Sequence, residues 1–253
     1  MAAYFDGARA RLKTARAADF GCTAADFDSH RLVVTSMPAT APSHYSLEAI
    51  TFGTGTVLSV REAYLEWVKE NAPAPHYRAM FANALLAPFV REAGSRGENM
   101  DFRAPGLGFI PADRIAARPV PPGFSDGRVD SEFRALHVQS ARFDNSLGEP
   151  DDEYVAGLWR YGFALFENGE PAAVAGAYDD GDGLLEIGVD VDREYRGRGF
   201  GPVVVTNLAA IIIAEAMVPT YYCSPTNVRS QRNALASGFL PVTSGARVTK
   251  TRP

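Results

Sequence analysis

The chain has 253 residues, 46% of them hydrophobic and 22% charged, with 25 basic against 30 acidic side chains. This composition is typical of a globular protein with a substantial core. The net charge of −5 argues against a general nucleic-acid binder, and Thr206, Asn207 and Glu215 interrupt the longest apolar stretch, which argues against a membrane-spanning helix.

The cysteines and the first residues bear on the compartment. The chain has two cysteines, Cys22 and Cys223, at opposite ends of the sequence. A secreted disulfide framework needs more cysteines at closer spacings, so we expect two free thiols and a cytoplasmic protein. The opening MAAYFDGARARLK is charged too early for a secretory signal. We therefore expect no membrane partner.

Residues 1–112 are expected to form an accessory domain of their own. The patterns predict, in chain order, a helix, a strand, a hairpin around Gly53-Thr54-Gly55 and two further helices, the second kinked at Pro88. The first helix is expected at about residues 8–18 and the strand within RLVVTSMP. The Pro/Gly-rich residues 101–127 are interpreted as an ordered connector or a domain boundary.

Residues 113–253 show a regular succession of elements. A helix over DSEFRALHVQSARFD, capped by Asp130 or Ser131, precedes three strands, with a type I′ turn at Asn168-Gly169. A helix from Pro202, a strand in TYYCSP, a helix capped by Asn227 and a hairpin at Ser244-Gly245 follow. The pattern predicts an α/β (α+β) fold, a mixed, mostly antiparallel sheet flanked by helices.

The sequence RGRGFG, residues 196–201, joins a predicted strand to a predicted helix. A helix start presents unpaired backbone N–H groups and a partial positive charge. The glycines at 197, 199 and 201 let the backbone approach a bulky anion, and Arg196 and Arg198 can add donors to phosphate oxygens. Together these features predict a pyrophosphate-binding loop.

Other phosphate-binding motifs fit this loop less well. A dinucleotide-binding G-x-G-x-x-G would place its third glycine one residue later, and an ATP-binding P-loop would need a lysine after Gly201. A disordered Arg/Gly segment would not lie between strong strand and helix patterns. An ordinary flexible turn without a ligand remains the simplest alternative.

Two spaced motifs give the chain a resemblance to a known family. The stretch Arg196-Gly197-Arg198-Gly199-Phe200-Gly201 fits the Q/R-x-x-G-x-G/A signature of the GNAT superfamily of acyl-CoA-dependent N-acetyltransferases. Asn227 stands eleven residues before Gly238-Phe239, a second spacing common in that superfamily. The resemblance covers about residues 119–250 and implies that residues 113–253 form an acetyl-CoA-binding catalytic domain.

The resemblance also implies how acetyl-CoA is held. The pyrophosphate would bind residues 196–201, and the pantetheine arm would pair with the backbone of the central strand around Val189 and Val191. The strand TYYCSP would splay away from that central strand and leave a slot for the thioester. Asn227 would contact the pantetheine, or it would only cap its helix.

The catalytic acid and base are less clearly indicated. Many GNAT proteins have a tyrosine seven residues after the asparagine, where this chain has Ala234. Tyr222 is the candidate acid, with Tyr221 beside it, although strand aromatics are more often core residues. Glu186 is the candidate base. In many relatives the acidic residue stands one position earlier, which points Glu186 to the other face unless a bulge intervenes, and a plain salt bridge is an equal alternative.

These observations predict an N-acetyltransferase that moves an acetyl group from acetyl-CoA to a primary amine of a small molecule. The alternative is a non-catalytic acyl-CoA-binding regulatory module. We expect no metal, because the four histidines have no ligand spacing, and no nucleic-acid partner. The carboxylates of FDNSLGEPDDE either attract a cationic amine or form a solvated loop. Residues 1–112 would narrow substrate choice or mediate a homodimer. The histidines are His30, His44, His76 and His137.

Overall fold

The computed structural model describes residues 2–72, 85–140 and 142–251, which fall into two compact units. The N-terminal unit comprises Arg9–Gly108, Cys223–Thr226 and Val242–Pro253, and the C-terminal unit comprises Met1–Ala8, Phe109–Tyr222 and Asn227–Pro241. Two long strands, β4 (Met100–Pro111) and β10 (Phe239–Lys250), have residues in both units, so the chain passes between the units within them. The domain boundary expected between residues 112 and 113 stays a prediction.

The N-terminal unit is built on strands in the order β1-β3-β2-β10-β4. β1 runs parallel to β3, while β2 is antiparallel to both β3 and β10. The GTG stretch joins β2 to β3 as a hairpin, as the sequence predicts. The other elements are α1 (Ala2–Phe20), β1 (Leu32–Ser36), β2 (Tyr45–Thr51), β3 (Thr56–Val60), α2 (Glu62–Asn71) and α3 (Leu86–Ser95).

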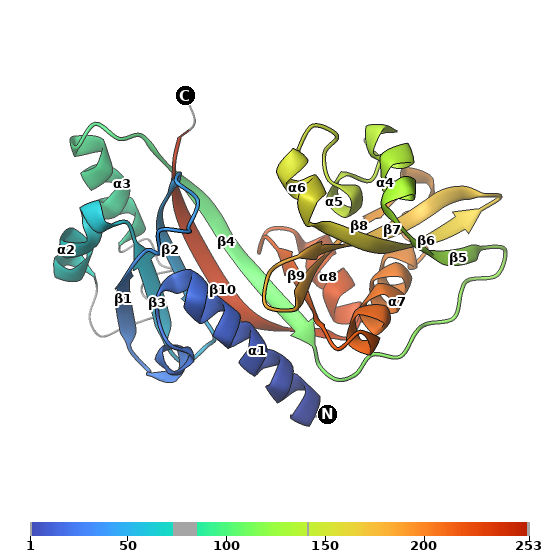
Figure 1. Ribbon diagram of the computed structural model, residues 1–253, viewed down its shortest axis with the longest axis horizontal. Coiled ribbons are helices and arrows are strands. Elements are labelled where there is room, and N and C mark those ends of the chain that lie inside the picture. The colour runs from blue at the N-terminus through green and yellow to red at the C-terminus, as the bar shows by residue number, and fades with distance from the viewer. Residues whose placement is uncertain (1, 73–84, 141, 252–253) are drawn as a thin grey trace. The chain divides into compact units, whose positions relative to one another are not determined.

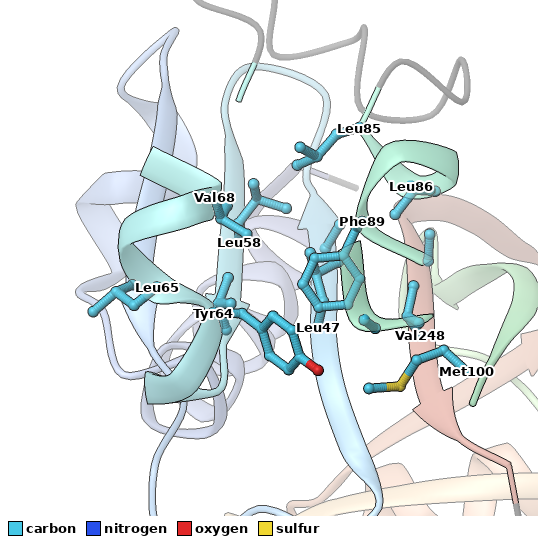
Figure 2. Packing of buried hydrophobic residues seen from close by; sticks show 14 residues of the cluster. Leu47, Leu58, Tyr64, Leu65, Val68, Leu85, Leu86, Phe89, Met100 and Val248 are labelled. Carbon is cyan, nitrogen blue, oxygen red and sulfur yellow. The ribbon is translucent and has the colours of Figure 1, made fainter. Parts of the chain in front are cut away.

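One face of this sheet packs on α2 and α3 through apolar side chains (Figure 2). Leu47 of β2, Leu58 of β3 and Val248 of β10 are fully buried, and Phe89 of α3 packs its ring 4.9 Å from that of Tyr64 in α2. Burial of side chains of this size contributes roughly 1.5–3 kcal/mol each. Alternate residues of three neighbouring strands therefore define the core of this unit.

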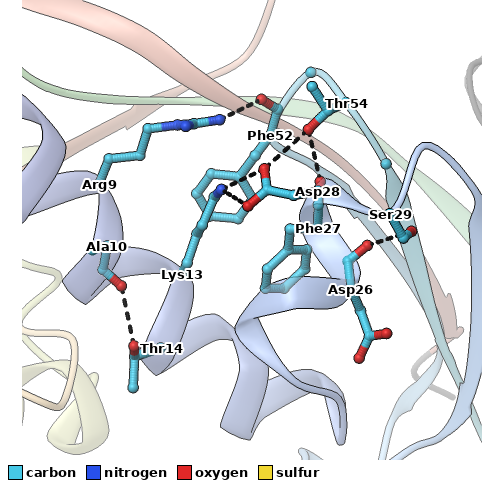
Figure 3. Close-up of polar contacts among 12 residues, drawn as sticks. Arg9, Ala10, Lys13, Thr14, Asp26, Phe27, Asp28, Ser29, Phe52 and Thr54 are labelled. Carbon is cyan, nitrogen blue, oxygen red and sulfur yellow. Dashed lines mark hydrogen bonds and ion pairs between the residues drawn. The ribbon is translucent and has the colours of Figure 1, made fainter.

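Polar contacts tie the part of α1 within this unit to the β2–β3 hairpin (Figure 3). The Nζ atom of Lys13, a nearly buried side chain, lies 2.5 Å from a carboxylate oxygen of Asp28 and 5.6 Å from the centre of the Phe52 ring. Arg9 donates to the carbonyl oxygen of Phe52, and the Thr54 hydroxyl donates to that of Phe27. The hairpin tip is thus held by hydrogen bonds, while the ion pair fixes Lys13 of α1 to Asp28 beside it.

The C-terminal unit holds strands in the order β9-β8-β7-β6-β5, antiparallel from β5 to β8 and parallel between β8 and β9. This mixed, mostly antiparallel sheet flanked by helices confirms the predicted fold class. Its elements are β5 (Ser125–Val129), α4 (Ser131–His137), α5 (Asp144–Leu147), α6 (Glu153–Leu158), β6 (Trp159–Glu167), β7 (Glu170–Asp179), β8 (Leu184–Val191), α7 (Phe200–Ala214), β9 (Val218–Cys223) and α8 (Val228–Ala236).

Helices cover both faces of β6–β8, with α4 to α6 on one side and α7 on the other (Figure 1). The short helix α5 lies so close to the sheet that only glycine fits beneath it. A Cβ atom on Gly176 would lie 1.8 Å from the carbonyl oxygen of Ser146, and one on Gly188 would lie 1.7 Å from that of Asn145. The two glycines therefore allow direct backbone-to-backbone packing.

The predicted turn at Asn168-Gly169 and the predicted helix ends at Asp130 and Gly238 are confirmed. Asn168 and Gly169 have φ angles of 53° and 87° between β6 and β7, as a type I′ turn requires. The Asp130 side chain accepts hydrogen bonds from two backbone N–H groups at the start of α4. At the end of α8, Gly238 has a φ of +86°, as expected for the position after a helix.

Several predicted elements are wrong in extent or type. Residues 101–127 are not all connector, because β4 occupies residues 100–111 and β5 begins at Ser125. Ser244-Gly245 is not a turn but part of the continuous strand β10, where Gly245 lies opposite Ile50 of β2. The helix expected over residues 130–144 ends at His137.

The helix expected over residues 77–94 lies partly outside the described residues, and Pro88 stands in the first turn of α3 rather than at a kink. A proline is tolerated there because the first N–H groups of a helix have no intrahelical partner. Over the described ranges, no helix is both long enough and apolar enough to cross a bilayer.

Candidate functional site

The loop from Arg196 to Gly201 joins β8 to α7 through two residues in the left-handed region. Gly197 and Gly199 have φ angles of +81° and +82°, which L side chains rarely adopt, and nothing lies within 4 Å of a Cβ built on either. Gly199 is the N-cap of α7 and supplies no side-chain cap. The first N–H groups of α7 therefore adjoin an open, glycine-lined stretch of backbone. Such an arrangement suits the binding of an anion.

Gly201, the third glycine of the motif, is required for a different reason from the first two. A Cβ on Gly201 would lie 2.7 Å from the side-chain oxygen of Asn233 in α8, so any larger residue would displace that side chain. The Asn233 amide donates to the Tyr221 hydroxyl of β9, which in turn lies 2.7 Å from the Ser230 hydroxyl. This chain of contacts ties the start of α7 to α8 and β9, and the sequence motif did not reveal it.

The two arginines of the loop have different surroundings. Arg196 donates from Nε to the carbonyl oxygen of Val191, at 3.0 Å, which folds its side chain back on the end of β8. The Arg198 guanidinium lies about 5 Å from three aromatic rings, those of Phe124, Tyr195 and Phe200. Cation–π contacts of this kind orient an exposed guanidinium without consuming its N–H donors.

The central strand β8 turns backbone groups away from β7 along its second half. Asp192 donates its N–H to Ala172 of β7, and in an antiparallel ladder such hydrogen-bonded pairs alternate with pairs that point outward. Val189 and Val191 are therefore outward-pointing and direct their N–H and C=O groups to the β9 side. These are the two residues that the sequence predicts to pair with pantetheine.

The register between β8 and β9 is short. It joins Leu184 to Val218 and ends with Glu186 opposite Thr220, while β8 continues to Val191. Over the part of the chain that the structure describes, the register gives residues 187–191 of β8 no partner in β9. This divergence is the one that the family resemblance implies, and it leaves the outward-pointing groups of Val189 beside the gap in the ladder.

Glu186 stands at the last paired position, between Tyr178 of β7 and Thr220 of β9. The β7–β8 register is continuous, without a bulge, so Glu186 shares the face of Gly188 against which α5 packs. Burial raises the pKa of Tyr178, and the negative charges of Asp190 and Glu186 add to this rise, while Arg134 opposes it. The Thr220 hydroxyl is buried and finds no hydrogen-bond partner among the described residues.

Asp190, which has the same parity as Glu186, anchors α5 to the strand. Its carboxylate accepts from the Asn145 amide at 2.7 Å, from the Ser146 N–H at 2.9 Å and from the Ser146 hydroxyl at 3.1 Å. Arg134 of α4 donates from Nε to the carbonyl oxygen of Leu147 at 2.7 Å. The acidic stretch FDNSLGEPDDE contains the short helix α5 and ends at Glu153, where α6 begins.

The tyrosine pair of β9 is divided by burial. Tyr221 is buried, and its hydroxyl is engaged by Ser230 and Asn233 of α8. Tyr222, the candidate acid, is half-buried on the opposite face of the strand. Ala234 is fully buried, so the place where many GNAT proteins carry a tyrosine lies inside the packing of α8.

Asn227 acts as a helix cap, because its side chain accepts the Ser230 N–H at 3.1 Å. Its contact with pantetheine stays a prediction. Of the four histidines in the sequence, His76 lies outside the described residues. Within the described ranges, no group of three or more histidine, cysteine or acidic side chains could hold a metal ion. Neither Cys22 nor Cys223 takes part in a disulfide.

Comparison with known proteins gives a family and a set of structural relatives. The family described as Acetyltransferase (GNAT) family matches residues 131–239. No curated protein matches the chain. The matched range includes the loop 196–201, the divergence of β8 and β9, and Asn227.

Three of the solved structures that resemble the chain come from bacteria of different genera. A GNAT-family protein from Novosphingobium aromaticivorans DSM 12444 is 21% identical over 60% of this chain, with a TM-score of 0.46. A GNAT-family acetyltransferase from Colwellia psychrerythraea is 16% identical over 64%, with a TM-score of 0.47. A GCN5-related N-acetyltransferase from Kribbella flavida is 16% identical over 84%, with a TM-score of 0.49. The chain spans 68%, 61% and 89% of their respective lengths.

Proposed function

Because residues 131–239 match the acetyltransferase (GNAT) family, we propose that this chain transfers an acetyl group from acetyl-CoA to a primary amine of a small molecule. The observation that carries the proposal is the loop Arg196–Gly201, where two left-handed glycines lead into an uncapped helix beside the diverging end of β8. A pyrophosphate needs such a cluster of backbone donors.

In this proposal the backbone N–H groups at the start of α7 bind the pyrophosphate, with Arg198 beside them. Arg196, held at Val191, closes the loop against β8. The outward-pointing backbone of Val189 and Val191 pairs with the pantetheine arm, and Asn227 lies at the start of the next helix. When bound, acetyl-CoA supplies the thioester that the amine attacks.

The proposed proton transfers rest on two residues near the end of the β8–β9 register. Glu186 accepts a proton from the attacking amine, directly or through water, and Tyr222 donates one to the departing thiolate. Placement of two reactants together can by itself supply an effective molarity on the order of 10⁵ M or more. Modest acid–base assistance is therefore sufficient for turnover.

A direct test is isothermal titration calorimetry of the full chain with acetyl-CoA and with CoA. We expect saturable binding of both, and we expect Arg198→Glu to weaken it at least about tenfold, because a carboxylate then faces the pyrophosphate. Arg114→Glu makes the same charge change at an exposed residue outside the motif and should bind like the wild type. Absence of binding at millimolar concentration would contradict the proposal.

The buried Ala234 favours a second candidate, an acyl-CoA-binding module without catalysis. A free-thiol assay with acetyl-CoA and a panel of small amines separates the two. Turnover of any amine excludes the purely binding role. The binding role is favoured if the chain binds CoA without turnover of any amine. In that case the Glu186→Gln and Tyr222→Phe variants should bind CoA like the wild type. The acceptor, the cytoplasmic location and the homodimer stay predictions.

A further inference from the structure

The N-terminal unit contains a cavity of about 510 Å³ where β2 and β4 begin and β10 ends. Its volume lies in the range of small-molecule sites, roughly 300–1,000 Å³. All of its lining residues belong to this unit, and none belongs to the motifs described above. The lining residues are His44, Tyr45, Asp101, Arg247, Thr249, Lys250 and Thr251.

Arg247 is held rigidly at the wall of this cavity. Its Nε atom donates to a carboxylate oxygen of Glu48 at 2.6 Å, and its Nη1 atom donates to the Tyr45 hydroxyl at 2.6 Å. Its guanidinium carbon lies 3.9 Å from the centre of the Tyr45 ring. A side chain already fixed in this way loses little conformational entropy when it binds a ligand.

The same guanidinium keeps donors available. A guanidinium carries five N–H groups, and the two hydrogen bonds to Glu48 and Tyr45 use two of them. The Arg247 side chain is 42% exposed, whereas that of Glu48 is 12% exposed, so the pair presents its cationic member to the cavity. The unused N–H groups match the two oxygens of a carboxylate.

The other charged groups of the lining extend the pattern. The Lys250 Nζ atom, 3.1 Å from Glu98, adds a second cation on β10, and its side chain is 47% exposed. Asp101, at the start of β4, is an exposed carboxylate in the same lining. The cavity therefore offers two cations and one anion, together with the hydroxyl groups of Thr249 and Thr251.

We propose that this cavity binds a zwitterionic small molecule, a free amino acid or a dipeptide, whose carboxylate lies against Arg247 and Lys250 and whose ammonium group lies against Asp101. The ligand class follows from charges of both signs around a single cavity. The lining shares no residue with the proposed acetyl-CoA site, so this proposal does not depend on the proposed function.

The test is calorimetry of the full chain, without CoA, against a panel of L-α-amino acids and dipeptides at up to about 10 mM. We expect at least one to bind saturably. Asp101→Asn and Lys250→Met change exposed residues and should each weaken that binding at least about tenfold. Arg247→Lys should also weaken it, because lysine keeps a charge beside Glu48 but loses the forked donor geometry.

Two controls make the result specific. Lys69→Met removes an exposed lysine of α2 that also pairs with a glutamate, so it should bind like the wild type. The deaminated acid and the decarboxylated amine of the best ligand should each bind at least about tenfold more weakly. The proposal is overturned if no panel member binds, if the cavity variants bind like the wild type, or if the deaminated acid binds as tightly as its parent.

Discussion

The two units of this chain constrain their sequences in different ways. In the C-terminal unit, the critical contacts are made by backbone atoms, as where α5 lies on Gly176 and Gly188. In the N-terminal unit, the comparable contacts are made by large side chains such as Leu47 and Phe89. Side-chain cores tolerate repacking at constant volume, whereas a backbone contact admits one residue type.

This difference explains why the sequence of the C-terminal unit carries a recognisable motif and that of the N-terminal unit does not. A glycine required at a particular position leaves a spaced motif, such as the one at residues 196–201. An apolar core leaves only a periodic pattern, which many folds share. Four amino-acid changes, ordered by expected effect, test this difference between the two units. The two tryptophans report on unfolding, because Trp67 lies in the N-terminal unit and Trp159 in the C-terminal unit.

The largest effect is expected for Gly188→Ala, since its Cβ would lie 1.7 Å from the Asn145 carbonyl oxygen and α5 would have to move. We expect a loss of more than about 5 kcal/mol of unfolding free energy in the C-terminal unit. Urea unfolding followed by Trp159 fluorescence, in a Trp67→Phe background, measures it. Gly127→Ala is the matched control in β5, with open space around the new methyl group, and should change stability by less than about 1 kcal/mol. Equal stability of the two variants would remove the contrast.

The next effect is expected for Phe89→Ala in the core of the N-terminal unit. Phe89 is fully buried, and its removal leaves a cavity beside Tyr64. We expect a loss of roughly 3–5 kcal/mol, read from Trp67 fluorescence in a Trp159→Phe background. Phe102→Ala is the control, because that ring is 44% exposed. A loss as small as the control's would mean that the core of this unit is not centred on α2 and α3.

A smaller effect is expected for Lys13→Met, which removes the ion pair with Asp28. The pair is partly exposed, so we expect a loss of about 1 kcal/mol or less. The hydrogen bond from Lys13 lowers the pKa of Asp28, so the pair stabilises the folded state above the carboxyl's ordinary pKa, near 4, and ceases to do so as pH falls below it. The stability difference between variant and wild type should therefore shrink between about pH 5 and pH 2, and a constant difference would contradict this assignment.

The smallest effect is kinetic. Burial, with a contribution from Asp26, raises the pKa of the Cys22 thiol to about 11. In a Cys223→Ser variant, the remaining thiol should react with an aromatic disulfide about tenfold faster for each pH unit between pH 7 and pH 10, because the thiolate is the reactive form. A rate that levels off near pH 8.5 would show an ordinary, unperturbed thiol.

Local chemistry could be predicted from the sequence, and pairing between distant segments could not. The turn at Asn168-Gly169, the caps at Asp130 and Asn227, and the left-handed glycines of the loop depend on neighbours a few residues away. The Pro/Gly content of residues 101–111 is typical of loops and predicts a connector, whereas their strand conformation in β4 comes from β10, far along the chain. Ser244-Gly245 likewise predicts a turn, whereas pairing with β2 makes it part of β10.

The candidate site shows the same limit. The sequence singles out Glu186, but its neighbours Tyr178 and Thr220 come from strands whose register is set by tertiary packing. Asp190 carries no motif, and its role as the anchor of α5 depends on a four-residue helix too short to leave a periodic signal. Arg247 and Asp101, which line the same cavity, belong to two segments of the N-terminal unit, Val242–Pro253 and Arg9–Gly108, that are far apart in the sequence.

The threading of β10 through both units has a practical consequence for anyone who wishes to dissect the protein. Its second half, from Ser244 to Thr249, pairs with β2, and β10 also neighbours β4. A fragment that begins at residue 113 would keep this half-strand but lose both flanking strands, and bare ladder edges promote self-association. Such a fragment should therefore precipitate unless residues 242–253 are removed with the amino-terminal segment.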